Sequence, residues 1–344
     1  MKTTIGMDLG DKHNRVCILN EQGEVIKTAS IVNTRTAIEK FFSKYPDCLV
    51  AIETGTHSPW ISRLLKELGC EVLVGNARKL RVIWDSESKS DVRDAEMLAR
   101  IARLDPKLLH PVEHRREQAQ VDLEVIKART VLKNSRVELT NHIRCVVKSL
   151  GYRLPSCTPA AFHNKAWEHL PDALRSALLP LFQCLEEISE SIKEYDRQIK
   201  QLSEEVYPET HRLRQVRGVG PVTALAYVLT IDNPDRFKKS RSLGPFLGLV
   251  PKRDQSGETD KQLHITKAGD RQLRCLLVNC SQFIMGPFGE DCDLRRFGEA
   301  IAERGGKNAK RRAVVAVARK LAVLLHALWK SEHEYAIFHG KAAA

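Results

Sequence analysis

The order of short apolar segments in the first 104 residues is the feature that most constrains the fold of this 344-residue chain. Three segments rich in β-branched and apolar residues come first, and the turn sequence Asn20–Gly23 separates the second from the third, as in a hairpin. Helical and strand-like segments then alternate, judged by the spacing of their apolar residues. The predicted strands are Thr3–Leu9, Arg15–Leu19, Val25–Val32, Cys48–Ile52 and Cys70–Val74, and the predicted helices are Thr36–Tyr45, Ser58–Leu68 and Asp91–Leu104.

Three antiparallel strands followed by alternating helices and strands is the element order of an RNase H-like (RuvC-like) α/β domain. A stretch without Gly or Pro follows, from about Glu117 to Leu150, and predicts one long helix. A loop with prolines then covers Leu154–Pro159.

Apolar residues next recur at alternating spacings of three and four, which is the a/d pattern of a heptad repeat. The stripe consists of Leu178, Leu181, Leu185, Ile188, Ile192, Tyr195, Ile199, Leu202 and Val206. Because the stripe is narrow and its flanks are charged, it favours a coiled coil that joins copies of the chain into a homo-oligomer, a dimer or a tetramer. The alternative is an antiparallel helix that packs on its own chain.

These features predict a RuvC-like domain with the long helix in residues 1–150, a linker and coiled coil in 151–206, a mostly α C-terminal domain in 207–335, and a tail in 336–344. The formal net charge of +12 is uneven: residues 206–344 hold 24 basic and 14 acidic side chains, whereas residues 1–205 hold 31 and 29. This excess favours a phosphate-bearing partner for the C-terminal part. The alternative is a basic surface that only keeps the chain in solution.

No apolar run is long enough to cross a bilayer, and the N-terminus lacks the apolar segment of a signal peptide. We therefore expect a cytoplasmic protein without a membrane partner. The nine cysteines form no CxxC pair, so we expect buried thiols rather than a zinc site.

Four carboxylates lie at the ends of two predicted strands and at the start of a predicted helix. Asp8 ends the first strand, Glu53 directly follows the fourth, and Asp91 and Asp94 share one face of a helix because they are three residues apart. Carboxylates that converge repel one another unless cations offset their charge, and hard divalent cations prefer such oxygen ligands. The pattern predicts Mg²⁺ or Mn²⁺, which can activate a nucleophile and hold a leaving oxygen at phosphorus.

Each acid also has a simpler interpretation. Asp8 could be a turn residue before Gly10, and Asp91 a helix N-terminal acid favoured by the macrodipole. Asp94 could pair with Lys89 or Arg93. Glu53 is the hardest to explain in this way, because a carboxylate directly after an apolar strand is costly unless something uses it.

The C-terminal part contains two kinds of candidate nucleic-acid contacts. Gly218 and Gly220 lie between two helical segments, an arrangement that resembles a helix-hairpin-helix turn, in which backbone N–H groups approach a phosphate. A tight turn with a purely structural role is the alternative. Basic residues that could contact phosphates without reading sequence are Lys252, Arg253, Lys261, Lys267, Arg271, Arg274, Lys310, Arg311 and Arg312. A solvated helix face is the alternative for each of them.

Six segments together resemble a known family. They are MDLG at residues 7–10, IETG at 52–55, SDVRDAEMLA at 90–99, RGVGPVTA at 217–224, FLGLVPKRDQSG at 246–257 and ITKAGDRQLRCLL at 265–277. In this order, from about residue 5 to 330, they are similar to the DEDD-type transposases of the insertion-sequence one-ten family, including its eleven-eleven subgroup.

The resemblance implies an enzyme of the bacterial nucleoid that cuts and rejoins donor and target DNA, with Asp8, Glu53, Asp91 and Asp94 as metal ligands. It also implies Ser256 as the nucleophile, a covalent phosphoserine intermediate, and a noncoding bridge RNA that pairs with both DNAs. Gln255 and Glu258 depart from the residues common beside this serine in the family.

From the residues alone, Ser256 lies in a polar loop where Ser-Gly is ordinary turn chemistry. Two other functions therefore stay open. One is a metal-dependent nuclease that cleaves DNA junctions by water attack, and the other is a non-catalytic nucleic-acid-binding scaffold whose acids are structural.

Overall fold

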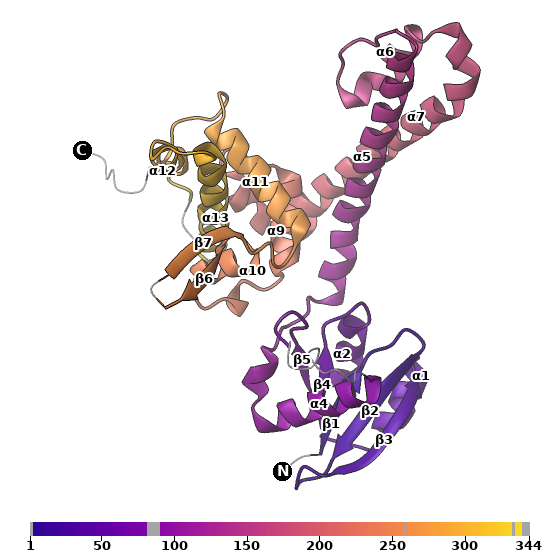
Figure 1. Ribbon diagram of the computed structural model, residues 1–344, viewed down its shortest axis with the longest axis vertical. Coiled ribbons are helices and arrows are strands. Elements are labelled where there is room, and N and C mark those ends of the chain that lie inside the picture. Colours follow the sequence, from indigo (N-terminus) through magenta and orange to yellow (C-terminus); the bar gives the residue numbers. More distant parts are fainter. Residues whose placement is uncertain (1–2, 81–89, 258, 332–333, 339–344) are drawn as a thin grey trace. The chain divides into compact units, whose positions relative to one another are not determined.

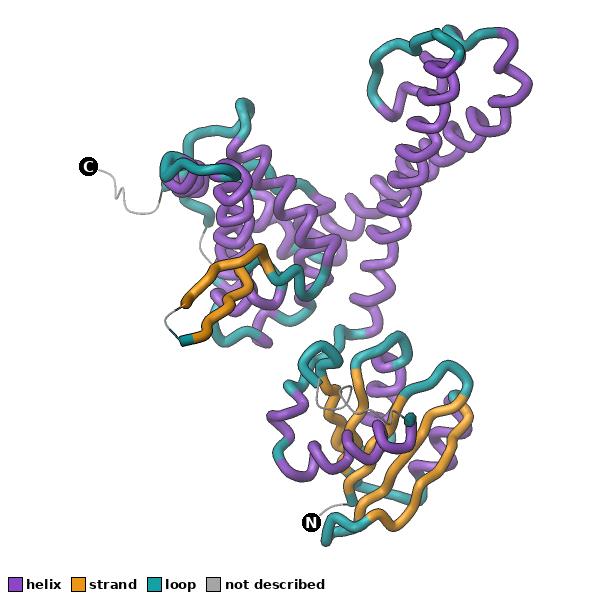
Figure 2. Tube along the Cα trace, in the orientation of Figure 1, coloured by secondary structure: helices purple, strands orange, loops and turns teal. Residues whose placement is uncertain are grey.

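The computed structural model describes residues 3–80, 90–257, 259–331 and 334–338. The chain divides into two compact units, Met1–His114 and Arg115–Ala344, and Figures 1 and 2 show the elements of each. The boundary falls before the long helix, so this helix belongs to the second unit, whereas the sequence placed it with the α/β domain.

The first unit is a mixed α/β structure around a five-stranded sheet of order β3-β2-β1-β4-β5. The strands are β1 (Thr4–Asp8), β2 (His13–Leu19), β3 (Val25–Val32), β4 (Leu49–Glu53) and β5 (Glu71–Gly75). β1, β2 and β3 pair antiparallel, whereas β4 is parallel to β1 and β5 is parallel to β4. This confirms the predicted three-stranded meander followed by αβ units.

Helices cover both faces of the sheet. On one face, α1 (Arg35–Phe42) and α2 (Ser58–Glu67) bury Ile38 and Leu65 against strand residues such as Met7. On the other face, α4 (Asp91–Leu104) packs Leu98 against Ala51. The sheet is therefore the middle layer of three.

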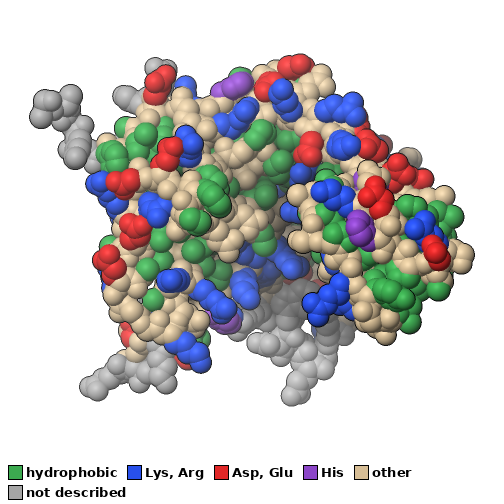
Figure 3. Space-filling view, turned by 90° about the horizontal axis from the view of Figure 1, so that it is seen from above, with side chains coloured by type: hydrophobic (Ala, Val, Ile, Leu, Met, Phe, Trp, Pro, Cys, Tyr) green, Lys and Arg blue, Asp and Glu red, His purple; other side chains and the backbone are tan. Residues whose placement is uncertain are grey.

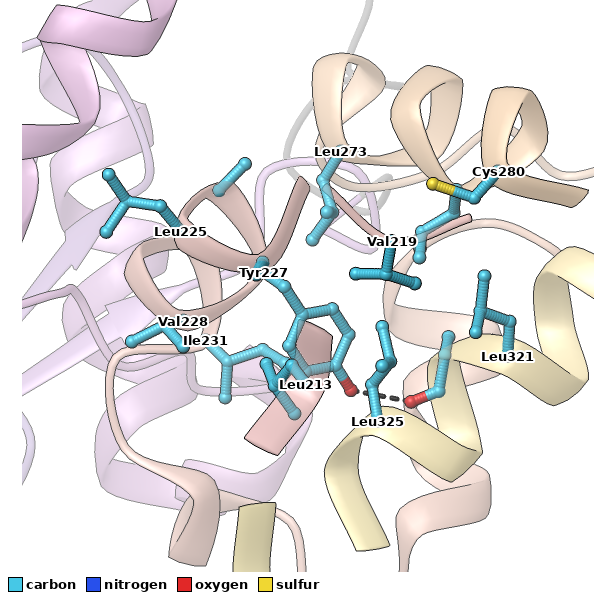
Figure 4. Packing of buried hydrophobic residues seen from close by; sticks show 14 of the residues in the cluster. Leu213, Val219, Leu225, Tyr227, Val228, Ile231, Leu273, Cys280, Leu321 and Leu325 are labelled. Carbon is cyan, nitrogen blue, oxygen red and sulfur yellow. Dashed lines mark hydrogen bonds between the residues drawn. The ribbon is translucent and has the colours of Figure 1, made fainter. Parts of the chain in front are cut away.

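The second unit is mostly helical. Its helices are α5 (Glu117–Ser149), α6 (Phe162–Glu168), α7 (Asp172–Gln201), α8 (Glu209–Arg214), α9 (Pro221–Ile231), α10 (Leu243–Phe246), α11 (Arg271–Met285), α12 (Asp293–Ala302) and α13 (Ala309–Lys330). Its core surrounds α9, whose residues are buried from Thr223 to Ile231. A helix that is apolar on every side belongs in such a position. Figure 4 shows this core, in which the Tyr227 hydroxyl donates to the Ala322 carbonyl at 2.6 Å.

The predicted heptad stripe lies on α7 and packs within its own chain. Leu178, Leu185, Ile192 and Ile199 are buried in a single copy, and α7 packs along α5. These four residues therefore pack as in the alternative, an antiparallel helix on its own chain. The other members of the stripe remain partly buried or exposed: Leu181, Ile188, Tyr195, Leu202 and Val206. A homo-oligomer that forms through the coiled coil stays a prediction.

Two strands that the sequence did not predict form a hairpin, β6 (Pro251–Ser256) and β7 (Thr259–Ile265). The segment predicted as a polar loop is thus mostly β-structure. Among the described residues, no helix is long and apolar enough to span a membrane.

Candidate active site

Asp8 and Glu53 are the last residues of two adjacent parallel strands. The pairing of β1 with β4 runs from Thr4↔Leu49 to Met7↔Ile52, so the two acids follow directly at the same edge of the sheet. Both side chains are partly buried, and the Oε1 atom of Glu53 is fully enclosed. The predicted placement of the two acids at strand ends is confirmed.

Both carboxylates face the layer that contains α4. A Cβ atom added to Gly6 would lie 1.9 Å from the Ala95 carbonyl oxygen, so the backbone of α4 lies directly on this side of β1. Because side chains alternate along a strand, Asp8 shares the face of Gly6. By the same alternation, Glu53 shares the face of Ala51, which packs against α4.

Helix α4 begins at the same edge of the sheet as these carboxylates. Its last turns contact the β2–β3 turn, where Arg100 and Arg103 donate to the carbonyls of Gly23 and Glu21 at 3.3 and 2.5 Å. That turn follows Leu19, which pairs with Thr4 at the opposite edge. The first turn of α4 therefore lies toward the edge where β1 ends.

Asp91 and Asp94 occupy this first turn. The Ser90 side chain accepts a hydrogen bond from the Arg93 backbone nitrogen at 3.4 Å and caps the helix. Acidic residues also suit a helix N-terminus, so local preference and the proposed ligand role agree. Asp94 is partly buried and Asp91 is exposed.

The donor chemistry fits a divalent cation, because carboxylate oxygens are the ligands that Mg²⁺ and Mn²⁺ prefer. Within the described ranges, however, no three acidic, His or Cys side chains approach closely enough to hold a metal ion. The fold thus brings four acids to one edge and one face without closing a ligand cage. Lys89, the alternative partner of Asp94, lies outside the described residues.

Sequence reasoning missed a polar network beside these acids. His57 Nε2 lies 3.3 Å from Asp11 Oδ1, and the buried Ser58 hydroxyl lies 2.9 Å from His114 Nε2. Each residue alone carried no signal, since Asp11 and His57 are 46 positions apart. Their position three and four residues after Asp8 and Glu53 was the only available hint.

Ser256 belongs to the second unit and is the last residue of β6. Its backbone is in register with Thr259 of β7, and Gly257, with φ of +55°, begins the turn between them. The serine thus ends a strand next to a hairpin turn, a defined backbone position that the polar-loop interpretation did not include.

The Gly-x-Gly segment forms a tight turn between α8 and α9, as predicted. Gly218 has φ of +93°, which favours glycine. Gly220 is the N-cap residue of α9, and a Cβ atom there would meet nothing within 4 Å. The backbone at the start of α9 is therefore open to an approaching group.

Most candidate phosphate-contacting residues that the structure describes are exposed. Lys252, Arg253, Lys267, Arg271, Lys310, Arg311 and Arg312 belong to this group. Arg253 binds Asp260 through two hydrogen bonds of 2.8 and 2.6 Å. The backbone of Lys261 pairs with Asp254, and its side chain is not among those described. In Figure 3, Lys and Arg side chains are spread widely over the drawn face, with acidic side chains among them.

Arg274 is the exception. It is only 8% exposed, and its guanidinium donates to the carbonyls of Leu247 and Ala268 at 2.9 and 2.7 Å. A buried guanidinium with these partners holds two segments of the domain together. The prediction that Arg274 contacts nucleic acid is therefore wrong.

The first turn of α13 contains Lys310, Arg311 and Arg312 and no acid. Positive charge at a helix N-terminus opposes the macrodipole and lowers helix stability. Local stability therefore does not explain this run, and a role in binding anions stays open.

Comparison with known proteins identifies relatives of both units. A family model of DEDD transposases of the IS110 type, described as a transposase, matches residues 5–151. A second model, described as "Transposase IS116/IS110/IS902 family", matches residues 210–290.

Among individual relatives, the transposase for insertion sequence element IS1328 of Yersinia enterocolitica is 28% identical, over 82% of this chain and 84% of its own length. The transposase for insertion sequence element IS1111A of Coxiella burnetii is 26% identical, over 96% and 90%. A pilin gene-inverting protein of Moraxella bovis is 26% identical, over 43% and 46%. With both models matched in order and the IS1328 and IS1111A transposases aligned over 84% and 90% of their length, the chain belongs to the IS110 family of transposases.

Proposed function

We propose that this transposase moves its insertion sequence by a metal-dependent reaction in which Ser256 becomes covalently joined to DNA. The observation that carries the proposal is the position of Asp8 and Glu53 on neighbouring strand ends. They lie at the edge of the sheet toward which the first turn of α4, with Asp91 and Asp94, lies. The element order also supports an RNase H-like fold for this unit, a fold that positions acids at strand ends.

The four carboxylates would hold Mg²⁺ or Mn²⁺, which supplies charge neutralisation at the scissile phosphate and lowers the pKa of a coordinated hydroxyl. The Ser256 hydroxyl attacks phosphorus, so that an O–P bond forms to the serine. The bond from phosphorus to one DNA oxygen breaks, and that oxygen leaves with a proton as the strand-end hydroxyl. A hydroxyl of another strand then attacks the phosphoserine, and this step restores the serine and joins the strands.

The basic surface of the second unit supports donor and target DNA as partners, since residues 206–344 have a net charge of +10. Contacts to phosphates do not read sequence, so recognition of the target has to come from elsewhere. The family resemblance supports a noncoding bridge RNA that pairs with both DNAs. It also supports a functional division near residue 150, where the first matched model ends at residue 151.

Covalent capture tests the nucleophile. The full-length chain is incubated with Mg²⁺, the RNA that flanks its gene and donor DNA, and adducts are resolved on a denaturing gel. We expect an adduct from the wild type and none from Ser256→Ala. Gln255→Ala, a change at the neighbouring position of the same strand, should keep the adduct.

Two outcomes would favour the other functions. Mg²⁺-dependent strand cleavage without an adduct, unaffected by Ser256→Ala, would identify a nuclease that uses water. Binding without cleavage by the wild type, and unchanged behaviour of Asp8→Asn, would identify a scaffold.

A further inference from the structure

The loop that follows Asp8 is held by an asparagine pair. Asn33 Nδ2 donates to the carbonyls of Gly10 and Asp11 at 2.9 and 3.3 Å. Its own Oδ1 accepts from Asn14 at 3.2 Å, and Asn14 is fully buried. The Nδ2 group of the buried Asn14 thus holds the Asn33 side chain in the orientation that reaches both carbonyls. The Asp8 side of the candidate site is therefore a rigid piece.

The loop that follows Glu53 is held separately. The Ser58 hydroxyl, on a fully buried residue, donates to the Gly55 carbonyl at 2.8 Å and accepts from the Gly55 nitrogen at 3.0 Å. The Thr54 backbone nitrogen donates to the carbonyl of Gly75 at 2.9 Å. The Glu53 side is thus a second rigid piece, anchored to β5 and α2.

The pairing between β1 and β4 stops at Met7 and Ile52, one residue before the two acids. Beyond this point, a contact between His57 and Asp11 joins the two loops. The Trp60 indole Nε1–H donates to His57 Nδ1 at 3.3 Å. Because Nδ1 accepts, Nε2 of the neutral ring has the hydrogen and donates it to Asp11.

We propose that His57 is a positioning residue for the metal site, which by donating to Asp11 fixes the spacing between the Asp8 and Glu53 loops. The inference rests on the proposed metal-dependent function. Two neighbouring carboxylates repel each other, so the strand ends tend to separate when no cation is bound. Mg²⁺ and Mn²⁺ tolerate little variation in ligand distance. A link that holds the two loops together therefore raises cation affinity.

Variants of the two residues separate this role from general stability. His57→Phe keeps a ring beside Trp60 but removes the donor, whereas His57→Gln keeps a donor toward Asp11. Asp11→Ala removes the acceptor, and the Asp11 side chain is 90% exposed, so the core is undisturbed. The readouts are Mn²⁺ binding by calorimetry and thermal melting without metal, both on the full chain.

We expect His57→Phe and Asp11→Ala to weaken Mn²⁺ binding by about three- to tenfold, in line with the modest strength of one partly exposed contact. His57→Gln should retain most of the affinity. Melting without metal should change little in all three variants. The control is Arg35→Ala, which breaks the exposed 2.6 Å ion pair with Glu67 between α1 and α2 and should leave Mn²⁺ binding unchanged.

Wild-type Mn²⁺ affinity in both His57→Phe and Asp11→Ala would overturn the inference, and equal losses in His57→Gln and His57→Phe would overturn the donor role. The proposed function is checked separately with Asp8→Asn. If the wild type binds no Mn²⁺, or if Asp8→Asn binds it normally, the metal site itself is refuted, and the positioning role with it.

Discussion

Replacing Gly6 with alanine should separate the acids of α4 from those of the sheet. The added Cβ would lie 1.9 Å from the Ala95 carbonyl oxygen and 2.6 Å from the Ala99 nitrogen, whereas ordinary contact begins at 3.4 Å. Both contacts are with backbone, so no side-chain rotation relieves them. Helix α4 then has to withdraw by about 1.5 Å, and overpacking of this kind costs about 1–3 kcal/mol.

The consequence for metal binding is larger than that for folding. Metal–ligand distances hold to within about 0.2 Å, so a withdrawal several times greater would remove Asp94 from the proposed metal site. We expect Gly6→Ala to melt at least about 4 °C lower and to lose Mn²⁺-dependent stabilisation and strand transfer. Gly55→Ala is the matched control, because its Cβ would meet nothing within 4 Å. Wild-type Mn²⁺ affinity in a folded Gly6→Ala variant would refute the contribution of α4 to the site.

Two further predictions concern the second unit. Burial lowers the pKa of His326 below its ordinary 6.5, so its stabilising effect is present above about pH 6.5 and is lost as pH falls through the lowered pKa. The melting temperature should therefore fall more between pH 7.5 and pH 5 for the wild type than for His326→Gln. Equal falls in the two proteins would contradict this prediction. Ile199→Asp places a charge at a position only 1% exposed, so it should lower stability by about 3 kcal/mol or more. Circular dichroism should then detect a loss of helix. If the variant stays folded and light scattering gives a lower mass than for the wild type, the residue instead joins two copies.

The elements of the first unit could be predicted because their signals are local. The residues before Glu53 form an unbroken apolar run, and Ser90 and Asp91 mark the start of a helix. The hairpin that ends at Ser256 could not be predicted in the same way. Residues 251–255 of β6 are exposed, so burial imposes no alternation of apolar and polar residues. The sequence therefore predicts a loop at this strand.

Other features depend on contacts that no local pattern records. An a/d stripe that includes Ile192 fits a helix of the same chain as well as one of another chain. The sequence predicts Arg274 to be an exposed cation, because nothing near it in the sequence indicates the carbonyls that it contacts in the fold. The link from His57 to Asp11 exists only once β1 and β4 lie side by side. For the candidate site, sequence predicted the acids, whereas the residues that hold their loops became visible only in the fold.

The distribution of buried residues along α5 has a consequence for its dynamics. Its buried residues cluster from Ala119 to Ile126 and again at Ile143 and Val147, with none between. At 1.5 Å per residue, about 25 Å of helix separates the two clusters. Amide hydrogens in this middle section should exchange through local openings. Those at the two ends of the helix should exchange only when a larger part of the unit unfolds. We therefore expect the core around Phe162 to open in hydrogen exchange while the core around α9 stays protected.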